Sequence, residues 1–593
     1  MEYIYLPVKR NYKIEKQTML GILQDIIDAG GGNADMKTIG DKYGLSRDER
    51  YAVEEYLEKA LVFADSEVYR TFLPIAEAEK RNVTAGKLDE SQGNAEEINM
   101  EKYGDPISIS LLQRSFCLGY PKAARIMQTL EDCGLIVKDE KGNKYLLATD
   151  RQNLRMRKET NMYFRKNETF TIGENETFVV EDLLGEGGQG EVYLVRNDSD
   201  GERYALKIYK NKVSQDFKYN LKNNIEKGNP SEDFLWPKRL FERTDGTAGY
   251  LMDLRPKNYV SFVSYLTGKH PFKNRAILIK WCVSLCSAFK KLHEQGYSYQ
   301  DLNDGSFFID PETGALLICD NDNVTADKKN LGILGKIRYM APEIVTGENM
   351  PDVHSDRFSL AVILFMALCL GNPFEGERLK NYDIIDEKAE YEMFGSDPVF
   401  VYHKERKDNR PIRGYHSSVL KRWAYIPLYV KEAFHRTFVD GIEDRENERT
   451  TEIEWLKLLT KYRDELITCP HCGYEYIYGF EEKKKYDVCP LCGKQTKDVC
   501  VLTIGKNKIV LEPGKYLYLC HLDKYTADYL TAVGKVVVNK NNPSLWGIKL
   551  ALENAVEIKD TSGNVKTIAG DGVVPIIRNL KIKFDENTVG EIK

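Results

Sequence analysis

Residues 297–308 read YSYQDLNDGSFF, and residues 316–322 read LLICDND. Asp301 lies in the first stretch and Asp320 in the second, and a glycine-rich segment and a lysine precede them in the chain. The glycine-rich segment, GEGGQGEV, would be weak evidence if it stood alone, because a plain hairpin can also be rich in glycine. The order and spacing of the four features together exclude a chance hairpin.

The segment GEGGQGEV, residues 185–192, places Gly185, Gly187 and Gly190 in a turn between two stretches whose apolar residues alternate like those of strands. Because glycine has no side chain, the backbone N–H groups of such a turn can lie over phosphates. Lys207 ends the motif YALK on the next strand-like stretch, where its ammonium can hold the same phosphates. These residues predict a nucleotide site.

Two further motifs complete the series: YMAPE, which ends at Glu343, and HSDRFSLAVILF, which carries Asp356 at the start of an apolar helix. In motif order and spacing the series resembles the eukaryotic-like (Hanks-type) serine/threonine protein kinase family. The resemblance implies a two-lobed kinase fold over residues 170–466, ATP and Mg²⁺ as cofactors, and phosphorylation of a protein Ser or Thr hydroxyl. It also implies that Glu343 pairs with Arg449 in a structural role.

The resemblance further implies roles for single residues. Asp301 and Lys207 are the expected catalytic residues, with Asp301 accepting the substrate proton, and Asp320 and Ser306 are the expected Mg²⁺ ligands. Glu226, in the weakly marked helix FKYNLKNNIEKG, is the expected partner of Lys207. The nucleotide-binding residues that it implies are Leu184, Gly185, Gly187, Gly190, Val192, Ala205, Lys207, Glu226, Met252, Asp253 and Leu254.

The catalytic segment departs from the family pattern at Tyr299 and Gln300, which stand where the family has histidine and arginine. Without the arginine, the usual clamp for a phosphate on the activation segment is missing, so the domain is of the non-RD type. Residues 322–341 contain only Thr325 and Tyr339 as Ser, Thr or Tyr residues. We expect this segment to fold without phosphorylation.

Three more departures bear on activity. Asn303 stands where serine/threonine kinases commonly have a lysine, and Ser306 replaces an asparagine, although serine is a poorer ligand for a hard cation. The DFG motif has become Asp320, Asn321, Asp322, in which the carboxylate of Asp322 could compensate at the metal. The retained motifs favour an active kinase, and the losses leave a nucleotide-binding pseudokinase scaffold as the alternative.

The motifs CPHCG and CPLCG supply Cys469, Cys472, Cys489 and Cys492. Two CxxC pairs at this spacing predict a structural Zn²⁺ site of four thiolates, and residues 467–497 are expected to form a zinc ribbon. A closed site of this kind leaves no position for a substrate, so we expect a structural or docking role. Reduced core cysteines are the alternative.

Residues 105–150 are expected to form a winged helix. The segment ISISLLQRSFCLGYPKAARIMQTLEDCGLIV resembles the gamma domain of the bacterial DNA translocase FtsK, and the alternation in IVKDEKGNKYLLA predicts a small hairpin behind two helices. Ser115 and Cys117 stand where that family tends to be basic, and winged helices also bind proteins, so DNA and protein both stay open as partners. The DNA contacts that the resemblance implies are Gln113, Arg114, Lys122 and Arg125.

The remaining segments complete an expected multidomain α+β architecture. Residues 1–78 read as a helical module with a helix-turn-helix pattern, residues 79–104 as a polar linker and residues 151–169 as a basic connector. Residues 498–593 contain short strands separated by turns, and this small β domain resembles a forkhead-associated (FHA) sandwich. It has no convincing arginine and serine pair for a phosphothreonine, so its binding role stays open.

The composition bounds the function classes. The 593 residues carry a net charge of −6, which argues neither for nor against nucleic acid, and we find no apolar run long enough for a bilayer. The start lacks the apolar centre of a signal peptide, and most of the 12 cysteines are scattered singly, so we expect a cytoplasmic protein without membrane association.

A kinase followed by a zinc ribbon and a β domain resembles bacterial kinases of stress-response and defence systems. A cognate phosphatase is then an expected partner, and a DNA-binding regulator with a nucleotide-sensing kinase fold is a further alternative. The sequence does not identify the substrate, the oligomeric state or the activation signal.

Overall fold

The computed structural model describes residues 163–593, except for 174–175, 187–189, 244, 333–334, 383–384, 386, 482–485 and 497. Before residue 163 it describes residues 42 and 45 and four short strands. Gly187 and the predicted DNA contacts Gln113, Arg114, Lys122 and Arg125 lie outside the described residues. None of the helices in the described part of the chain has the length and apolar character needed to cross a membrane.

Two antiparallel hairpins are described in the N-terminal region. β3 (Ile136–Lys138) pairs with β4 (Tyr145–Leu147), which confirms the small hairpin predicted from IVKDEKGNKYLLA. β1 (Tyr3–Leu6) pairs with β2 (Tyr12–Glu15), although the sequence analysis predicted no strands there. The run YIYL is rich in aromatic and β-branched residues, which favour strands, and this was the signal available in the sequence.

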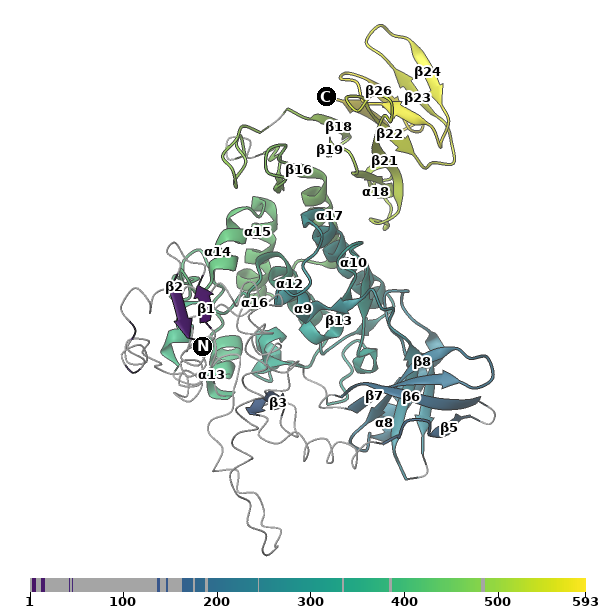
Figure 1. The fold of residues 1–593 in the computed structure, drawn as a ribbon, viewed down its shortest axis with the longest axis vertical. Helices are drawn as coiled ribbons and strands as arrows, with labels where there is room; N and C mark the ends of the chain where they lie inside the picture. Colours follow the sequence, from purple (N-terminus) through teal and green to yellow (C-terminus); the bar gives the residue numbers. More distant parts are fainter. Residues whose placement is uncertain are drawn as a thin grey trace, which may run out of the picture.

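A six-stranded antiparallel sheet forms the first lobe of the central region, in the order β5-β6-β7-β8-β10-β9 (Figure 1). Alternate residues of β7 are buried, as expected for a strand with one face on a core. One face of the sheet packs on Phe164, and the other packs on Leu221 of helix α8 (Gln215–Lys227). The strands are β5 (Thr169–Ile172), β6 (Glu176–Glu186), β7 (Gly190–Asn197), β8 (Arg203–Tyr209), β9 (Arg239–Glu242) and β10 (Ala248–Asp253).

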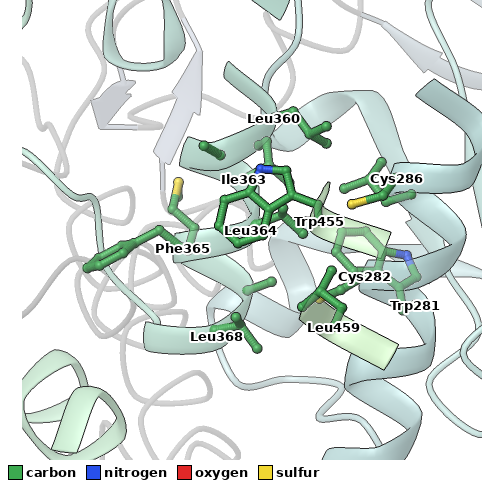
Figure 2. Packing of buried hydrophobic residues seen from close by; sticks show 14 of the residues in the cluster. Trp281, Cys282, Cys286, Leu360, Ile363, Leu364, Phe365, Leu368, Trp455 and Leu459 are labelled. Carbon is green, nitrogen blue, oxygen red and sulfur yellow. The ribbon is translucent and has the colours of Figure 1, made fainter. Parts of the chain in front are cut away.

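Helices form the second lobe, and three of them meet at its centre: α10 (Arg275–Glu294), α12 (Val353–Cys369) and α17 (Glu452–Glu465). Figure 2 shows Trp281 of α10, Leu364 of α12 and Trp455 of α17 packed in this core. Helix α12 is apolar almost all round because it is surrounded by other elements. The other helices of this lobe are α9 (Phe262–Leu266), α11 (Pro342–Val345), α13 (Glu387–Tyr391), α14 (Ser417–Ala424), α15 (Leu428–His435) and α16 (Gly441–Glu443).

A buried ion pair braces the second lobe. The two terminal nitrogens of Arg449 donate to the two carboxylate oxygens of Glu343, both at 2.7 Å. Both side chains are buried, and such bidentate pairs are among the stronger charge-assisted contacts. The structure therefore confirms the predicted pairing of Glu343 with Arg449.

Two small sheets fix the chain around the predicted catalytic residues. One has the order β11-β13-β14, and the other pairs β12 with β15. The N–H of Leu235 donates to the carbonyl of Ile318 at 2.8 Å, which ties the first lobe to the strand that precedes Asp320. The strands are β11 (Val260–Ser261), β12 (Tyr297–Ser298), β13 (Phe307–Ile309), β14 (Leu316–Ile318) and β15 (Thr325–Ala326).

The C-terminal region is a ribbon followed by a two-sheet sandwich with its own apolar core. In the ribbon, β16 (Leu466–Thr468) continues directly from α17 and pairs with β17 (Glu475–Ile477). The sandwich has sheets of order β19-β18-β27-β26-β23-β24 and β20-β21-β22-β25, which agrees with the predicted small β domain. Its elements are β18 (Cys500–Ile504), β19 (Asn507–Leu511), β20 (Tyr516–Tyr518), α18 (Leu519–Leu522), β21 (Ala532–Val538), β22 (Trp546–Leu550), β23 (Val556–Lys559), β24 (Val565–Ile568), β25 (Val573–Pro575), β26 (Lys581–Lys583) and β27 (Val589–Ile592).

The sandwich packs against the end of helix α17 (Figure 1). Nε2 of His521 lies 2.9 Å from Oδ2 of Asp464, and both side chains are buried. The guanidinium of Arg463 stacks 3.5 Å from the ring centre of Tyr518. The last helix of the second lobe is therefore also the docking surface of the β domain.

Candidate active site

Lys207 lies on the middle of the first-lobe sheet, with its side chain buried between two aspartates that follow strand β14. Its Nζ donates to Oδ1 of Asp320 at 3.1 Å and to both oxygens of Asp322 at 3.0 Å. Burial lowers the pKa of Lys207, but the charges of Asp322 and Asp320 outweigh it and hold the pKa above its ordinary value. The ammonium is therefore charged and fixed at the junction of the lobes.

Asp322 is almost fully buried and accepts hydrogen bonds from three side chains. Besides Lys207, the hydroxyls of Tyr209 and Tyr250 donate to it at 2.7 and 2.9 Å. Burial raises the pKa of Asp322, but the ammonium and these hydrogen bonds lower it below its ordinary value. This placement corrects the interpretation of Asp322 as an additional metal ligand, because its oxygens face Lys207 and the two tyrosines.

Glu226 does not take the position that the sequence analysis expected. It lies near the end of α8 with its side chain exposed, whereas Lys207 is buried. The anionic contact predicted for Glu226 is made by Asp322 instead. The sequence could not decide this, because both carboxylates lie at plausible distances along the chain and only the tertiary fold brings one of them to Lys207.

Helix α8 contacts the catalytic region through two neutral side chains. The amide nitrogens of Asn220 and Asn224 each donate to the carbonyl of Val324 at 2.8 Å. Both asparagines are buried, and their spacing of four residues places them on one face of the helix. The sequence analysis missed these two residues, although paired asparagines on one helix face were a readable signal.

Asp320 has the properties expected of a metal ligand. It adopts a left-handed backbone conformation with φ of 56°, which is uncommon for a residue other than glycine and turns the chain at this point. Its side chain is 46% exposed, in contrast to that of Asp322 at 1%. An accessible carboxylate oxygen is the donor that Mg²⁺ prefers.

Asp301 lies in the loop between β12 and β13, hydrogen-bonded to its own neighbours. The amide nitrogen of Asn303 donates to Oδ1 of Asp301 at 2.9 Å, and the amide oxygen accepts from Nζ of Lys336 at 2.8 Å. Burial raises the pKa of Asp301, while the positive charge of Lys336 and the hydrogen bond from Asn303 oppose that rise. The amide of Asn303 therefore orients the carboxylate of Asp301 and also binds the ammonium of Lys336.

Ser306 is fully buried inside the same loop. Its hydroxyl donates to the carbonyl of Asp301 at 3.3 Å and accepts from the N–H of Asn303 at 3.2 Å. The structure therefore places Ser306 where it holds the backbone of Asp301, with both of these bonds inside the loop. Its predicted role as a second Mg²⁺ ligand stays a prediction.

Gln300 links the catalytic loop to the activation segment through its side-chain amide. Its Nε2 lies 2.6 Å from the hydroxyl of Thr325 and 2.5 Å from the carbonyl of Lys329, and its Oε1 accepts from Asn330 at 3.0 Å. Thr325 and Tyr339 are both buried. The expectation that this segment folds without phosphorylation agrees with these neutral contacts.

The buried carboxylate of Asp356 holds the backbone of residues 299–300. The N–H groups of Tyr299 and Gln300 donate to the two oxygens of Asp356 at 2.5 and 3.0 Å. His293 lies between Asp356 and Glu452, at 3.2 and 2.9 Å. The catalytic loop therefore rests on a charged cluster in the core of the second lobe.

The predicted nucleotide residues lie around one apolar cluster. Ala205 pairs with Met252 across strands β8 and β10, and both are buried with Leu317 and Cys319 of the second lobe. Val192 and Leu254 pack against the same cluster, and Gly185 pairs with Val192 across strands β6 and β7. At Gly190 an added Cβ would lie 2.1 Å from the carbonyl oxygen of Ile208, so this position requires glycine. Leu184 is half exposed, and Asp253 is exposed with Oδ1 2.6 Å from Nζ of Lys238.

The four predicted zinc ligands come together in the ribbon. The sulfur atoms of Cys469, Cys472, Cys489 and Cys492 all lie within 4.8 Å of one another, and two pairs are 3.6 Å apart. A tetrahedral Zn²⁺ with Zn–S bonds of about 2.3 Å sets its sulfurs about 3.8 Å apart. The arrangement fits a closed four-thiolate metal site, and it excludes separate cysteines scattered in the core.

Comparison with known proteins agrees with this geometry. Residues 178–421 match the family model of the protein kinase domain, and residues 95–145 match that of the FtsK gamma domain. Serine/threonine-protein kinase sck2 of Schizosaccharomyces pombe is 25% identical over 209 residues, which cover 32% of this chain and 31% of sck2. Ribosomal protein S6 kinase alpha-2 of Homo sapiens is 28% identical over 222 residues, 36% of this chain and 29% of that kinase. The chain thus spans about a third of the length of these relatives. The region that is similar to the protein kinase domain therefore follows a region that is similar to the FtsK gamma domain.

Proposed function

We propose that the chain is an ATP-dependent protein kinase that transfers the γ-phosphoryl group to a Ser or Thr hydroxyl of a protein. The observation that carries the proposal is that Lys207 contacts Asp320 at the junction of two lobes and that the charges of both act on the carboxyl of Asp301, with Lys207 charged and Asp320 accessible. Of the relatives, sck2 is a serine/threonine-protein kinase by name, and the second is a ribosomal protein S6 kinase. The names of these relatives do not identify the substrate of this chain.

Each of the three predicted site residues has its own task in the reaction. Asp301 accepts the proton of the attacking hydroxyl while the hydroxyl oxygen bonds to the γ-phosphorus and the bond to the bridging oxygen of ADP breaks. Lys207 binds the phosphates of the nucleotide, and Asp320 would hold Mg²⁺, whose charge would neutralise phosphate oxygens. Asp322, Tyr209 and Tyr250 keep Lys207 in place throughout.

Incubation with labelled ATP and Mg²⁺ tests the proposal. Label on the wild-type chain or on an added protein substrate, and none with Lys207→Ala or Asp320→Ala, supports a working kinase. An absence of label together with a thermal shift on adding ATP supports the alternative, a nucleotide-binding pseudokinase scaffold. The departures from the kinase family pattern at Asn303, Ser306 and Asp322 are the reason for testing this alternative.

We also propose that residues 95–145 bind DNA, because the family that matches them is the FtsK gamma domain. Lys122 and Arg125 are the predicted phosphate contacts. Changing both to alanine is expected to weaken binding to duplex DNA and to flatten its salt dependence, since fewer counterions are released. An unchanged salt slope would leave protein binding as the function of this module. A role in bacterial stress or defence signalling, with a cognate phosphatase, stays a proposal that rests on the domain order.

A further inference from the structure

The proposed phosphate-transfer site has a neutral residue at the position where serine/threonine kinases commonly have a lysine. Asn303, two residues beyond Asp301, is neutral. A transferred phosphoryl group carries negative charge on its oxygens, and its stabilisation relies on cations and hydrogen-bond donors set in place beforehand. The region beside Asp301 therefore needs a positive group from another segment.

Lys336 brings an ammonium to this position from the activation segment. Its Nζ lies 2.8 Å from the amide oxygen of Asn303 and 3.8 Å from Oδ1 of Asp304. The amide of Asn303 donates at its other end to Asp301. One asparagine side chain thus stands directly between the ammonium and the predicted catalytic carboxylate.

The backbone before Lys336 is fitted closely to the catalytic loop. Gly335 has φ of +97°, and a Cβ at this residue would lie 3.1 Å from the carbonyl oxygen of Gln300 and 3.4 Å from Oδ1 of Asp301. On the other side, the carbonyl of Lys336 accepts from the N–H of Tyr339 at 2.9 Å. These contacts fix the origin of the side chain, while the side chain itself is 58% exposed and free to meet a ligand from solvent.

We propose that Lys336 contacts the phosphoryl group during transfer and that Asn303 holds its ammonium beside Asp301 until then. The inference rests on the proposed kinase activity. A lysine suits this role because its ammonium is a compact point charge with three donors on a flexible stem. In this chain the catalytic loop carries the amide of Asn303, and the activation segment carries the charge of Lys336.

The first test is Lys336→Gln, which keeps a donor near Asn303 and removes the charge. We expect kcat to fall roughly a hundredfold, the magnitude typical for loss of one transition-state donor, with KM for ATP changed by less than about threefold. The thermal midpoint is expected to stay unchanged, because the side chain is mostly exposed. The matched control is Lys328→Gln, which changes an exposed lysine of the same segment and is expected to retain full activity.

A charge relocation separates a catalytic from a structural role. Asn303→Lys combined with Lys336→Gln returns a cation to the site from the other segment, and we expect it to recover at least about tenfold of the lost kcat. Lys336→Arg is expected to retain more activity than Lys336→Gln. A Lys336→Gln variant within about threefold of the wild-type kcat would overturn the inference, as would equal losses in the Gln and Arg variants with a lowered thermal midpoint. An inactive wild-type chain would instead overturn the proposed function itself.

Discussion

Nζ of Lys207 lies 3.0 Å from both carboxylate oxygens of Asp322, a residue only two positions beyond the predicted metal ligand Asp320. The partner of the predicted phosphate-binding lysine thus belongs to the segment that also carries the predicted metal ligand. Both members of the pair lie outside helix α8, which contacts the same segment through Asn220 and Asn224. We infer that lysine, metal ligand and activation segment are assembled as one unit.

The first prediction concerns this pair. Asp322→Asn leaves the ammonium of Lys207 in a buried site with its main anion removed, and breaking a buried pair from one side costs about 3–5 kcal/mol. We expect a loss of this order in the free energy of unfolding, measured by urea denaturation, and a strong loss of phosphotransfer. Glu226→Gln is the control and is expected to change stability by less than about 0.5 kcal/mol, because its side chain is exposed. The reverse ranking would restore Glu226 as the partner of Lys207.

The second prediction concerns pH. Burial lowers the pKa of His293, but the hydrogen bonds that its ring donates to Asp356 and Glu452 outweigh burial and raise the pKa to about 9. The folded pKa is above the unfolded value of about 6.5, so the stabilisation is fully present below that value and is lost as the pH rises through 9. It amounts to on the order of 3 kcal/mol.

The measurement is the free energy of unfolding between pH 6 and pH 10, for the wild type and for His293→Gln. The wild type is expected to lose stability over this range, and the variant is expected to show a flatter profile. Parallel profiles would show that His293 is not protonated in the folded protein. On the acid side, burial raises the pKa of Glu452, but His293 and Arg357 lower it to about 2, so the same contact is lost again as the pH falls from about 4.5 toward 2.

The third prediction concerns activation. Thr325 is buried and hydrogen-bonded to the amide of Gln300, so phosphorylation there would require the segment to open. We expect phosphatase treatment of the purified chain to leave its activity unchanged and Thr325→Ser to retain activity within about threefold. Gln300→Ala is expected to lower activity more, because it removes the hydrogen bonds that tie Gln300 to Thr325, Lys329 and Asn330, at a net of about 0.5–1.5 kcal/mol each. Stoichiometric phosphate at Thr325 in active enzyme would contradict this account.

The fourth prediction concerns the ribbon. We expect one Zn²⁺ per chain by metal analysis, and we expect Cys472→Ser to lower both the metal content and the thermal midpoint, because structural zinc contributes directly to folding. Cys500→Ser, outside the cluster, is the control. Full metal content in the Cys472→Ser variant would exclude the four-thiolate site.

Much of the fold could be predicted from local signals. The order of Gly185, Lys207, Asp301 and Asp320 predicted two lobes with a site between them, and the pairing of Glu343 with Arg449 followed from the same motifs. The spacing of the CxxC pairs predicted the cysteine cluster. Each of these depends on short-range patterns that tolerate little variation.

The contacts that replace missing family residues could not be predicted in the same way. Asp322 contacts Lys207, and Lys336 contacts Asn303, only because the fold brings different segments of the chain within 3 Å of each other. A buried tyrosine such as Tyr250 looks like an ordinary core residue in the sequence. In the structure its hydroxyl donates a hydrogen bond to the carboxylate of Asp322. Spacing along the chain carries no information on such pairs.

The central claim is tested most directly by single-turnover phosphotransfer from labelled ATP with the wild type and Asp301→Asn. Asp200→Asn, in an exposed turn, serves as the control. The account predicts that Asp301→Asn loses transfer by a factor of at least about a hundred while it binds ATP with unchanged affinity, and that the control equals the wild type. Transfer that survives in Asp301→Asn, or a wild-type chain that binds ATP and transfers nothing, would contradict it.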